Sequence, residues 1–267
     1  MLKDVTLGQF FPGDTIAHRL DPRTKLIMTV VYIVALFIAK SYISYAVMFA
    51  VLAICMFVSK ISPKTALKGL KPVVIIVIFT SLLNMLYTPG DVIVKFWIFT
   101  ITKQGIRTAF FMAIRIMMLI TGTFLLTYTT SPIALTDGME LLLNPLKKIK
   151  VPVHELAMMM STALRFIPLL IEETDKIMSA QKARGANFDT GNIVERAKAM
   201  LPVLVPLFVS AFRRADELAT AMESRCYHGD KGRTRMKQIK MAGRDWCALV
   251  LTGLVLAGII ALASKGL

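Results

Sequence analysis

Cysteine is scarce in this chain, which has Cys55, Cys226 and Cys247 as its three cysteines among 267 residues. Three cysteines this far apart exclude a disulfide framework and a cysteine-rich metal cluster. Cys55 lies inside an apolar run and Cys247 at the edge of one, so both are expected to act as small buried hydrophobic residues. The first 25 residues lack a positively charged stretch followed by an apolar run, so no cleaved signal peptide is expected.

Catalytic motifs are missing as well. The chain has no glycine-rich loop ending in Lys-Ser or Lys-Thr, so it is not expected to hydrolyse ATP itself. His154-Glu155 begins like a zinc-protease helix, but Met158 stands where the second histidine is needed. There is no Gly-x-Ser-x-Gly elbow. We therefore predict no catalytic residue, no cofactor and no metal, and we expect a protein that binds partners.

Charged residues make up 18% of the chain, whereas 55% of the residues are hydrophobic and the mean hydropathy is +0.63. A soluble domain of this length rarely carries so much apolar surface. The apolar residues gather in runs with very little charge, namely residues 27–39, 42–58, 73–86, 106–129 and 246–263. About 20 residues of helix cross the roughly 30 Å hydrocarbon core of a bilayer. The runs thus predict an all-α polytopic membrane protein with about five transmembrane helices.

Acidic residues are outnumbered, because 17 Asp and Glu face 32 Lys and Arg and leave a net charge of +15. An excess of this sign would suit nucleic acid, but the positive charges lie beside the apolar runs. They are Lys60, Lys64, Lys68 and Lys71 between two runs, and Lys231, Arg233, Arg235, Lys237, Lys240 and Arg244 before the last. This distribution follows the positive-inside rule. It predicts a cytoplasmic N-terminus, a C-terminus outside and no nucleic-acid partner.

Two features interrupt the apolar pattern. Arg115 stands near the middle of residues 106–129, where a charge costs at least about 2.5 kcal/mol on insertion scales. It is expected to face a polar partner, either in a structural contact or on a transport path with Asn84. Residues 88–91 form a turn signal, and the β-branched and aromatic residues after them predict a short extracellular hairpin or an interfacial segment. Trp97 would suit the headgroup region.

Residues 131–245 combine many charges with apolar stripes, which indicates long amphipathic helices outside the bilayer core. Pro132 and Pro152 mark helix starts, because proline fits a first turn that lacks amide partners. We therefore predict three regions. Residues 1–130 form an N-terminal membrane region with four transmembrane helices, residues 131–245 form a cytoplasmic helical region, and residues 246–267 form a C-terminal transmembrane helix.

Two similar segments lie 41 residues apart, because residues 175–185 align with residues 216–226. Each segment ends in an arginine between small residues, as Ala183-Arg184-Gly185 and as Ser224-Arg225-Cys226. Small residues at a helix end let another backbone approach closely while the guanidinium binds its carboxylates or carbonyls. We interpret the two ends as docking points for two similar partner surfaces. The alternative is two surface helices with ordinary charged ends.

These arginine motifs resemble the signature of the transmembrane T component of energy-coupling factor (ECF) transporters. The segment Leu20-Asp21-Pro22-Arg23-Thr24-Lys25 before the first apolar run resembles that family too, through Asp21, Pro22, Arg23 and Lys25. The resemblance covers nearly the whole chain. The second arginine motif departs from Ala-Arg-Gly at Ser224 and Cys226, which are both small.

The resemblance implies a scaffold in a bacterial cell membrane that links two ABC-type ATPase subunits to an exchangeable substrate-binding membrane subunit for uptake of vitamins or related micronutrients. Residues 131–245 would then hold the coupling helices. The residues implied to dock the ATPases are Ala183, Arg184, Gly185, Ser224, Arg225 and Cys226. Met158, Met159 and Met160 are a possible contact for the substrate-binding subunit, because methionine-rich surfaces repack against several partners; the alternative is that they fill a core. Competing functions are a stand-alone secondary carrier and an intramembrane enzyme acting on lipid.

Overall fold

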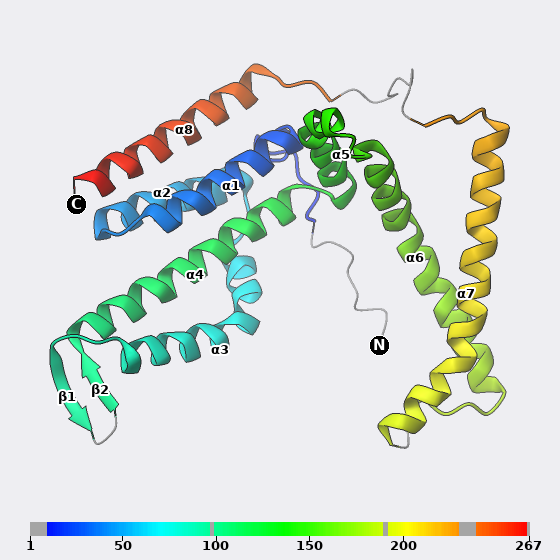
Figure 1. Ribbon diagram of the computed structural model, residues 1–267, viewed down its shortest axis with the longest axis horizontal. Coiled ribbons are helices and arrows are strands. Elements are labelled where there is room, and N and C mark those ends of the chain that lie inside the picture. Colours follow the sequence, from blue (N-terminus) through cyan, green and yellow to red (C-terminus); the bar gives the residue numbers. More distant parts are fainter. Residues whose placement is uncertain (1–9, 97–98, 189–191, 230–238, 266–267) are drawn as a thin grey trace. The chain divides into compact units, whose positions relative to one another are not determined.

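The computed structural model describes residues 10–96, 99–188, 192–229 and 239–265, whose regular elements are helices and one short β-hairpin (Figure 1). These residues form two compact units. In the first, which we call the membrane unit, the chain up to Met139 packs with the chain from Ile239 onward. The second, which we call the α6–α7 unit, extends from Glu140 to Gly229.

The membrane unit consists of helices joined by short connections. Its elements are α1 (Pro22–Ile38), α2 (Tyr42–Ser59), α3 (Pro63–Tyr87), β1 (Val92–Phe96), β2 (Phe99–Thr102), α4 (Lys103–Thr129), the first part of α5 (Pro132–Leu143) and α8 (Gly243–Ser264). Several helices begin at a polar side chain that accepts a hydrogen bond from the first turn. Asp21 does so for α1, Ser62 for α3 and Thr102 for α4. The predicted helix start at Pro132 is confirmed.

The predicted hairpin is confirmed between α3 and α4. Strands β1 and β2 pair antiparallel, with Val92 opposite Thr102 and Phe96 opposite Phe99. The pairing is irregular between Val92 and Val94. Trp97, which was predicted to lie in the headgroup region, falls outside the described residues.

Five of the described helices are long and apolar enough to cross a membrane: α2, α3, α4, α6 (Val153–Ala183) and α8. Four of them coincide with predicted transmembrane helices. The fifth, α6, falls in the region predicted to be cytoplasmic, and it is the least apolar of the five. Helix α1, which holds the first predicted transmembrane run, has 17 residues, one fewer than α2, and is not among the five.

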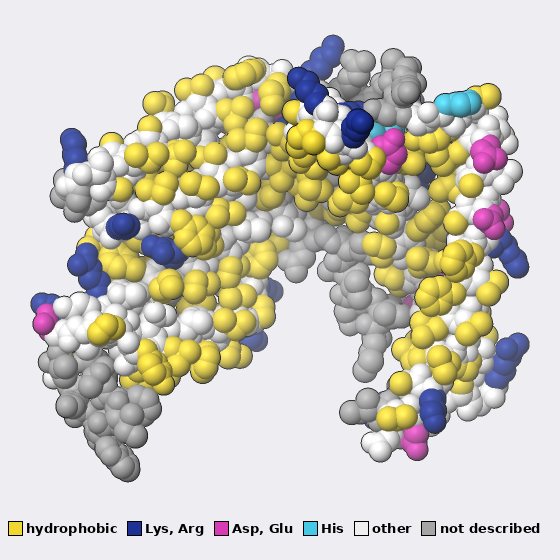
Figure 2. All heavy atoms as spheres, in the orientation of Figure 1, with side chains coloured by type: hydrophobic (Ala, Val, Ile, Leu, Met, Phe, Trp, Pro, Cys, Tyr) yellow, Lys and Arg dark blue, Asp and Glu magenta, His cyan; other side chains and the backbone are white. Residues whose placement is uncertain are grey.

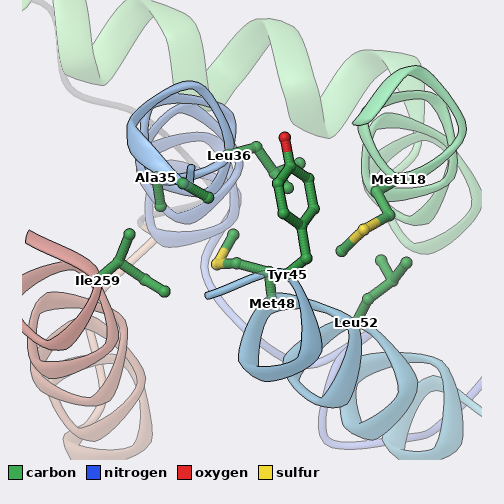
Figure 3. Packing of buried hydrophobic residues seen from close by; sticks show 8 residues of the cluster. Ala35, Leu36, Tyr45, Met48, Leu52, Met118 and Ile259 are labelled. Carbon is green, nitrogen blue, oxygen red and sulfur yellow. The ribbon is translucent and has the colours of Figure 1, made fainter. Parts of the chain in front are cut away.

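The core of the membrane unit joins four helices (Figure 3). Its side chains are nearly inaccessible to solvent and come from α1 (Ala35, Leu36), α2 (Tyr45, Met48, Leu52), α4 (Met118) and α8 (Ile259). Helices α2 and α3 expose large apolar side chains, such as Phe57 of α2 at 86% and Ile75 of α3 at 75%. A surface of this kind needs an apolar surrounding, which a bilayer supplies.

Arg115 has the polar partners that its place in an apolar run requires. Its Nε donates a hydrogen bond to the hydroxyl of Tyr45 at 2.8 Å, and its Nη2 donates to the carbonyl of Ala39 at 3.2 Å. The guanidinium also lies over the rings of Phe37 and Tyr45. Because Ala39 ends α1, Arg115 ties α4 to the connection between α1 and α2.

The α6–α7 unit contains a short 3₁₀ helix, η2 (Asn144–Ile149), followed by α6 (Val153–Ala183) and α7 (Ile193–Ser224). Helix α6 begins directly after Pro152, as predicted. Glu173 of α6 accepts hydrogen bonds from the Ser210 hydroxyl and, at 2.9 Å, from Arg214 Nη2, both on α7. Further along, Gln181 Nε2 donates to the carbonyl of Pro202 at 3.4 Å. The partner numbers fall on α7 as they rise on α6, so the two helices run antiparallel.

Candidate docking site at the ends of α6 and α7

Helix α6 ends at Arg184 in a regular hydrogen-bonded cap. The N–H of Gly185 donates to the carbonyl of Lys182 at 3.0 Å, and the N–H of Ala186 donates to the carbonyl of Gln181 at 3.0 Å. This pair of bonds is the Schellman motif, in which the residue after the cap takes a left-handed conformation. Gly185 has φ +90°. The glycine of the first arginine motif is therefore explained by the backbone turn that it makes.

Helix α7 ends in the same way at Arg225. The N–H of Cys226 donates to the carbonyl of Glu223 at 2.8 Å, and the N–H of Tyr227 donates to the carbonyl of Met222 at 3.1 Å. Cys226 takes the place of Gly185 and has φ +54°. The two arginine motifs thus share one local structure, with the arginine as the last residue before the turn. In the second motif a cysteine adopts the conformation that glycine adopts more easily.

The six predicted docking residues are all exposed, and they are Ala183, Arg184, Gly185, Ser224, Arg225 and Cys226. The antiparallel packing places the two motifs at opposite ends of the helix pair (Figure 1). At 1.5 Å per residue, Arg184 lies about 16 Å beyond Glu173, and Arg225 lies about 22 Å beyond Ser210 in the other direction. The two arginine ends are therefore roughly 40 Å apart, measured along the two helices.

The N-terminal motif lies in the membrane unit and is mostly buried. Asp21 is 5% exposed, and its backbone N–H donates to Oδ1 of Asp245 at 2.8 Å. Arg23 Nη2 lies 3.2 Å from Asp21 Oδ2 and donates to the carbonyl of Ile239 at 2.9 Å. Lys25 Nζ donates to the carbonyl of Thr129 at 2.8 Å. We call Asp21, Arg23, Lys25 and Asp245 the N-terminal charge cluster.

This cluster connects helix ends that are far apart in the sequence. It joins the start of α1 to the start of α8, through Asp245, and to the end of α4, through Thr129. Pro22 adds a close contact with α5, because a Cβ built on Gly138 would lie 2.8 Å from the Cβ of Pro22. The four motif residues therefore hold the membrane unit together at one end.

Comparison with known proteins shows the family of this chain. A family model described as cobalt transport protein (CbiQ) matches residues 13–236. The energy-coupling factor transporter transmembrane protein EcfT of Ruminiclostridium cellulolyticum is 53% identical over 254 residues, which are 95% of this chain and 94% of that protein. The chain belongs to this ECF transmembrane family. The proteins of the same description from Thermosediminibacter oceani and Bacillus subtilis are 52% identical over 259 residues and 47% identical over 261 residues, and each alignment covers 97% of this chain and 98% of the relative.

Membership in the ECF transmembrane family confirms the resemblance found in the sequence, and the chain is thus the transmembrane component of an ECF transporter. The matched range of the family model contains both arginine motifs and the N-terminal motif. It ends before α8. The alignments with the relatives cover at least 95% of the chain, so they reach into α8.

The predicted methionine patch lies on the first half of α6 and is only partly buried. Met159 is 56% exposed and Met160 is 46% exposed, whereas Met158 is half-buried. A larger apolar surface follows α7 (Figure 2), formed by Leu201, Leu204, Val205, Phe208, Val209 and Phe212. Phe212 is 70% exposed. In an ECF transmembrane component, apolar surfaces this extensive require either lipid or another subunit.

The shared cap predicts opposite effects of two small substitutions on the helix ends. Gly185→Ala should destabilise the end of α6 by about 1 kcal/mol, because alanine avoids the left-handed conformation. Cys226→Gly should stabilise the end of α7 by about 0.5–1 kcal/mol for the same reason. Hydrogen exchange of the last-turn amides measures both, and exchange should become faster at α6 and slower at α7.

Gly253→Ala in α8 is the matched control, because a Cβ there meets no atom within 4 Å and the backbone is helical. It should slow exchange slightly or leave it unchanged. A slowing at α6 by Gly185→Ala would contradict the assignment of the left-handed cap.

Two features of the site were missed by the sequence analysis. One is the contact of Glu173 with Ser210 and Arg214, which lie 37 and 41 positions later in the chain. The other is Asp245, the third residue of α8, which accepts a hydrogen bond from the N–H of the N-cap residue Ala242; an acidic residue in the first turn of an expected helix is the signal that would have indicated it.

Proposed function

We propose that the chain is the scaffold subunit that couples ATP hydrolysis by two partner ABC-type ATPases to a substrate-binding membrane subunit, for uptake of vitamins or related micronutrients. The observation that supports this function best is the pair of equivalent, exposed arginine ends on one antiparallel helix pair. Two similar ATPase subunits offer two similar surfaces, and Arg184 and Arg225 present the same local structure to each. ATP hydrolysis itself would reside in the partners.

The proposed orientation follows the charge distribution. Lys64, Lys68 and Lys71 lie at the start of α3, and Lys240 and Arg244 lie at the start of α8, so these ends face the cytoplasm. The N-terminus is then cytoplasmic, the C-terminus lies outside, and the α6–α7 unit lies on the ATPase side. Helix α6 is long and apolar enough to span, but its sequence continues into charged turns that end at Arg184, and we place it in the cytoplasmic coupling region.

The geometry of the helix pair suits the transmission of motion. The hydrogen bonds of Glu173 with Ser210 and Arg214 fix the point at which α6 and α7 cross. When ATP draws the two ATPases together, a displacement of the Arg184 end relative to the Arg225 end rotates the helices about this point. The apolar surface of α7 and the Met158–Met160 patch would carry the rotation to the substrate-binding subunit.

Isolation of the full chain from its own cells in mild detergent tests this function. We expect two ATPase subunits and a small apolar membrane protein to co-purify, and ATP hydrolysis to require the ATPases. The chain alone in proteoliposomes should transport no substrate. Uptake by the chain alone would support a stand-alone carrier instead. Arg115 and Asn84 give that alternative no support, since Asn84 donates to the carbonyl of Thr80 in its own helix and Arg115 binds Tyr45 and Ala39.

A further inference from the structure

A cavity of about 310 Å³ opens in the membrane unit among α1, α2, α4 and α8. Its volume falls in the lower part of the range of roughly 300–1,000 Å³ found for ligand sites. Ile54 on α2 and Leu251 on α8 line it and are 61% and 63% exposed, so the cavity opens sideways between these two helices. Its inner wall includes Ala35, Met48 and Leu52, which belong to the core shown in Figure 3. We call it the α2–α8 groove.

The groove is elongated along the helices, and its length is close to the thickness of the hydrocarbon part of one leaflet. On α8 its lining begins at Arg244 and ends at Leu256, and on α2 it extends from Ser59 back to Met48. These stretches correspond to about 18 Å and about 16 Å at 1.5 Å per residue. Half of the roughly 30 Å hydrocarbon core is about 15 Å. The groove therefore has the length that one lipid chain occupies in one leaflet.

The walls of the groove offer no free hydroxyl group to a polar ligand along most of this length. The hydroxyls of Thr29, Ser59 and Thr252 each donate to a carbonyl one turn earlier in their own helix, at 2.8, 2.7 and 2.8 Å. The hydroxyls of Thr129 and Tyr32, which also line it, donate to the carbonyls of Leu125 at 2.8 Å and Met118 at 3.4 Å, and most of the other lining side chains are aliphatic. An apolar chain satisfies such walls, whereas a polar solute would lose its hydrogen bonds to water there.

One end of the groove carries positive charge. Arg244 lines this end, is exposed, and makes no hydrogen bond or ion pair with any residue that the structure describes. Lys25 lines it as well, but its ammonium group is engaged by the carbonyls of His18 and Thr129. Trp246, which is 62% exposed, lies two residues after Arg244, and tryptophan is typical of the headgroup level. Arg244 is thus free to bind an anion at the depth of lipid phosphates.

We propose that the α2–α8 groove binds one anionic phospholipid from the surrounding leaflet, with an acyl chain along α2 and α8 and the headgroup phosphate on Arg244. The guanidinium of Arg244 can bind two phosphate oxygens through two N–H groups at once. The groove separates the acyl chain of this lipid from the other lipids. In the proposed orientation this is the cytoplasmic leaflet, which is the side of α1 on which the N-terminal charge cluster lies. The lipid would fill space between α2 and α8 that the protein itself leaves open.

Photochemical labelling tests the acyl-chain site. The full chain is placed in nanodiscs of phosphatidylcholine with a minor share of phosphatidylglycerol that carries a diazirine in the middle of one acyl chain. Labelled peptides are expected to concentrate on residues 48–59 and 248–256. Ala248→Phe, which fills the groove, should reduce this labelling about fivefold or more, since about 1 kcal/mol of lost binding gives a factor of about five.

Ala257→Phe is the matched control, because Ala257 is exposed on the same helix and does not line the groove. It should leave the labelling unchanged. If Ala248→Phe does not fold, Cys55→Phe fills the groove from the wall of α2 and should have the same effect. Even labelling of all lipid-facing helices, or equal effects of Ala248→Phe and Ala257→Phe, would overturn the proposal.

A second pair of variants tests the phosphate contact. Arg244→Gln should reduce the preference for phosphatidylglycerol over phosphatidylcholine in the groove about fivefold, as expected for one basic residue at an anionic membrane surface. Lys265→Gln removes a charge at the other end of α8 and should leave the preference unchanged. The labelling is repeated on the complex with its partner subunits. If the groove loses its label there, a partner segment occupies it and the lipid assignment fails.

Discussion

Charge reversal at both arginine ends, Arg184→Glu with Arg225→Glu, is expected to release both ATPases while the chain stays in the membrane. Both side chains are exposed in the chain alone, so the substitutions should change its stability by less than about 0.5 kcal/mol. In a complex, reversal of a buried interface charge costs about 2–5 kcal/mol at each end. Co-purification of the ATPases with the tagged chain should therefore fall about a hundredfold or more.

The single variants separate the two ends. Arg184→Glu should weaken the ATPase bound at the end of α6 and retain the one at the end of α7, and Arg225→Glu should do the reverse. Arg165→Glu with Arg213→Glu is the matched control, because it makes the same change of charge at exposed arginines away from the helix ends. Retention of both ATPases by the double variant at Arg184 and Arg225 would refute the docking role. Equal loss in the control would mean that net charge, not the helix ends, governs binding.

The candidate spanning helices were predictable where apolar runs are long, as in α2, α3, α4 and α8, even though Arg115 interrupts the run of α4. A run of this kind has few alternatives, because in lipid the helix alone satisfies every backbone group within one segment. The hairpin was predictable from its turn signal and its β-branched residues. Amphipathic α6 shows where composition stops being informative, since a long helix with one apolar stripe meets the length and hydropathy of a span without being apolar all round.

The arginine positions of the candidate site were visible in the sequence because they repeat in register. The sequence did not show why glycine follows Arg184 and why cysteine follows Arg225. A cysteine gives no sign in the sequence that its backbone is left-handed. The hydrogen bonds of the cap and the positive φ show that Cys226 occupies, at the end of α7, the position that Gly185 occupies at the end of α6. The tie between Asp21 and Asp245 was also out of reach, because contacts between residues more than 200 positions apart leave no periodic pattern in the chain.

Asp245→Ala is expected to produce the largest loss of stability of any single substitution considered for the membrane unit. Asp245 is 1% exposed, and its two oxygens accept hydrogen bonds from the N–H groups of Asp21 and Ala242, both at 2.8 Å. Alanine would leave these donors without their acceptor, at about 1–3 kcal/mol each. It would also remove the negative charge beside buried Lys25. We expect a total loss of about 3–5 kcal/mol, as for other broken buried charge contacts.

Thermal unfolding of the purified chain in one detergent measures this loss, and the midpoint should fall by about 10 °C or more for a chain of this size. Asp14→Ala removes the same side chain from an exposed position in the same unit, since the side chain of Asp14 is 96% exposed, and should leave the midpoint nearly unchanged. Because Asp245 lies at the start of α8 and Asp21 at the start of α1, the loss should appear first as separation of α8 from α1. Faster hydrogen exchange confined to these two helix starts would show it, whereas exchange that rises equally in all helices would contradict a local role for the cluster.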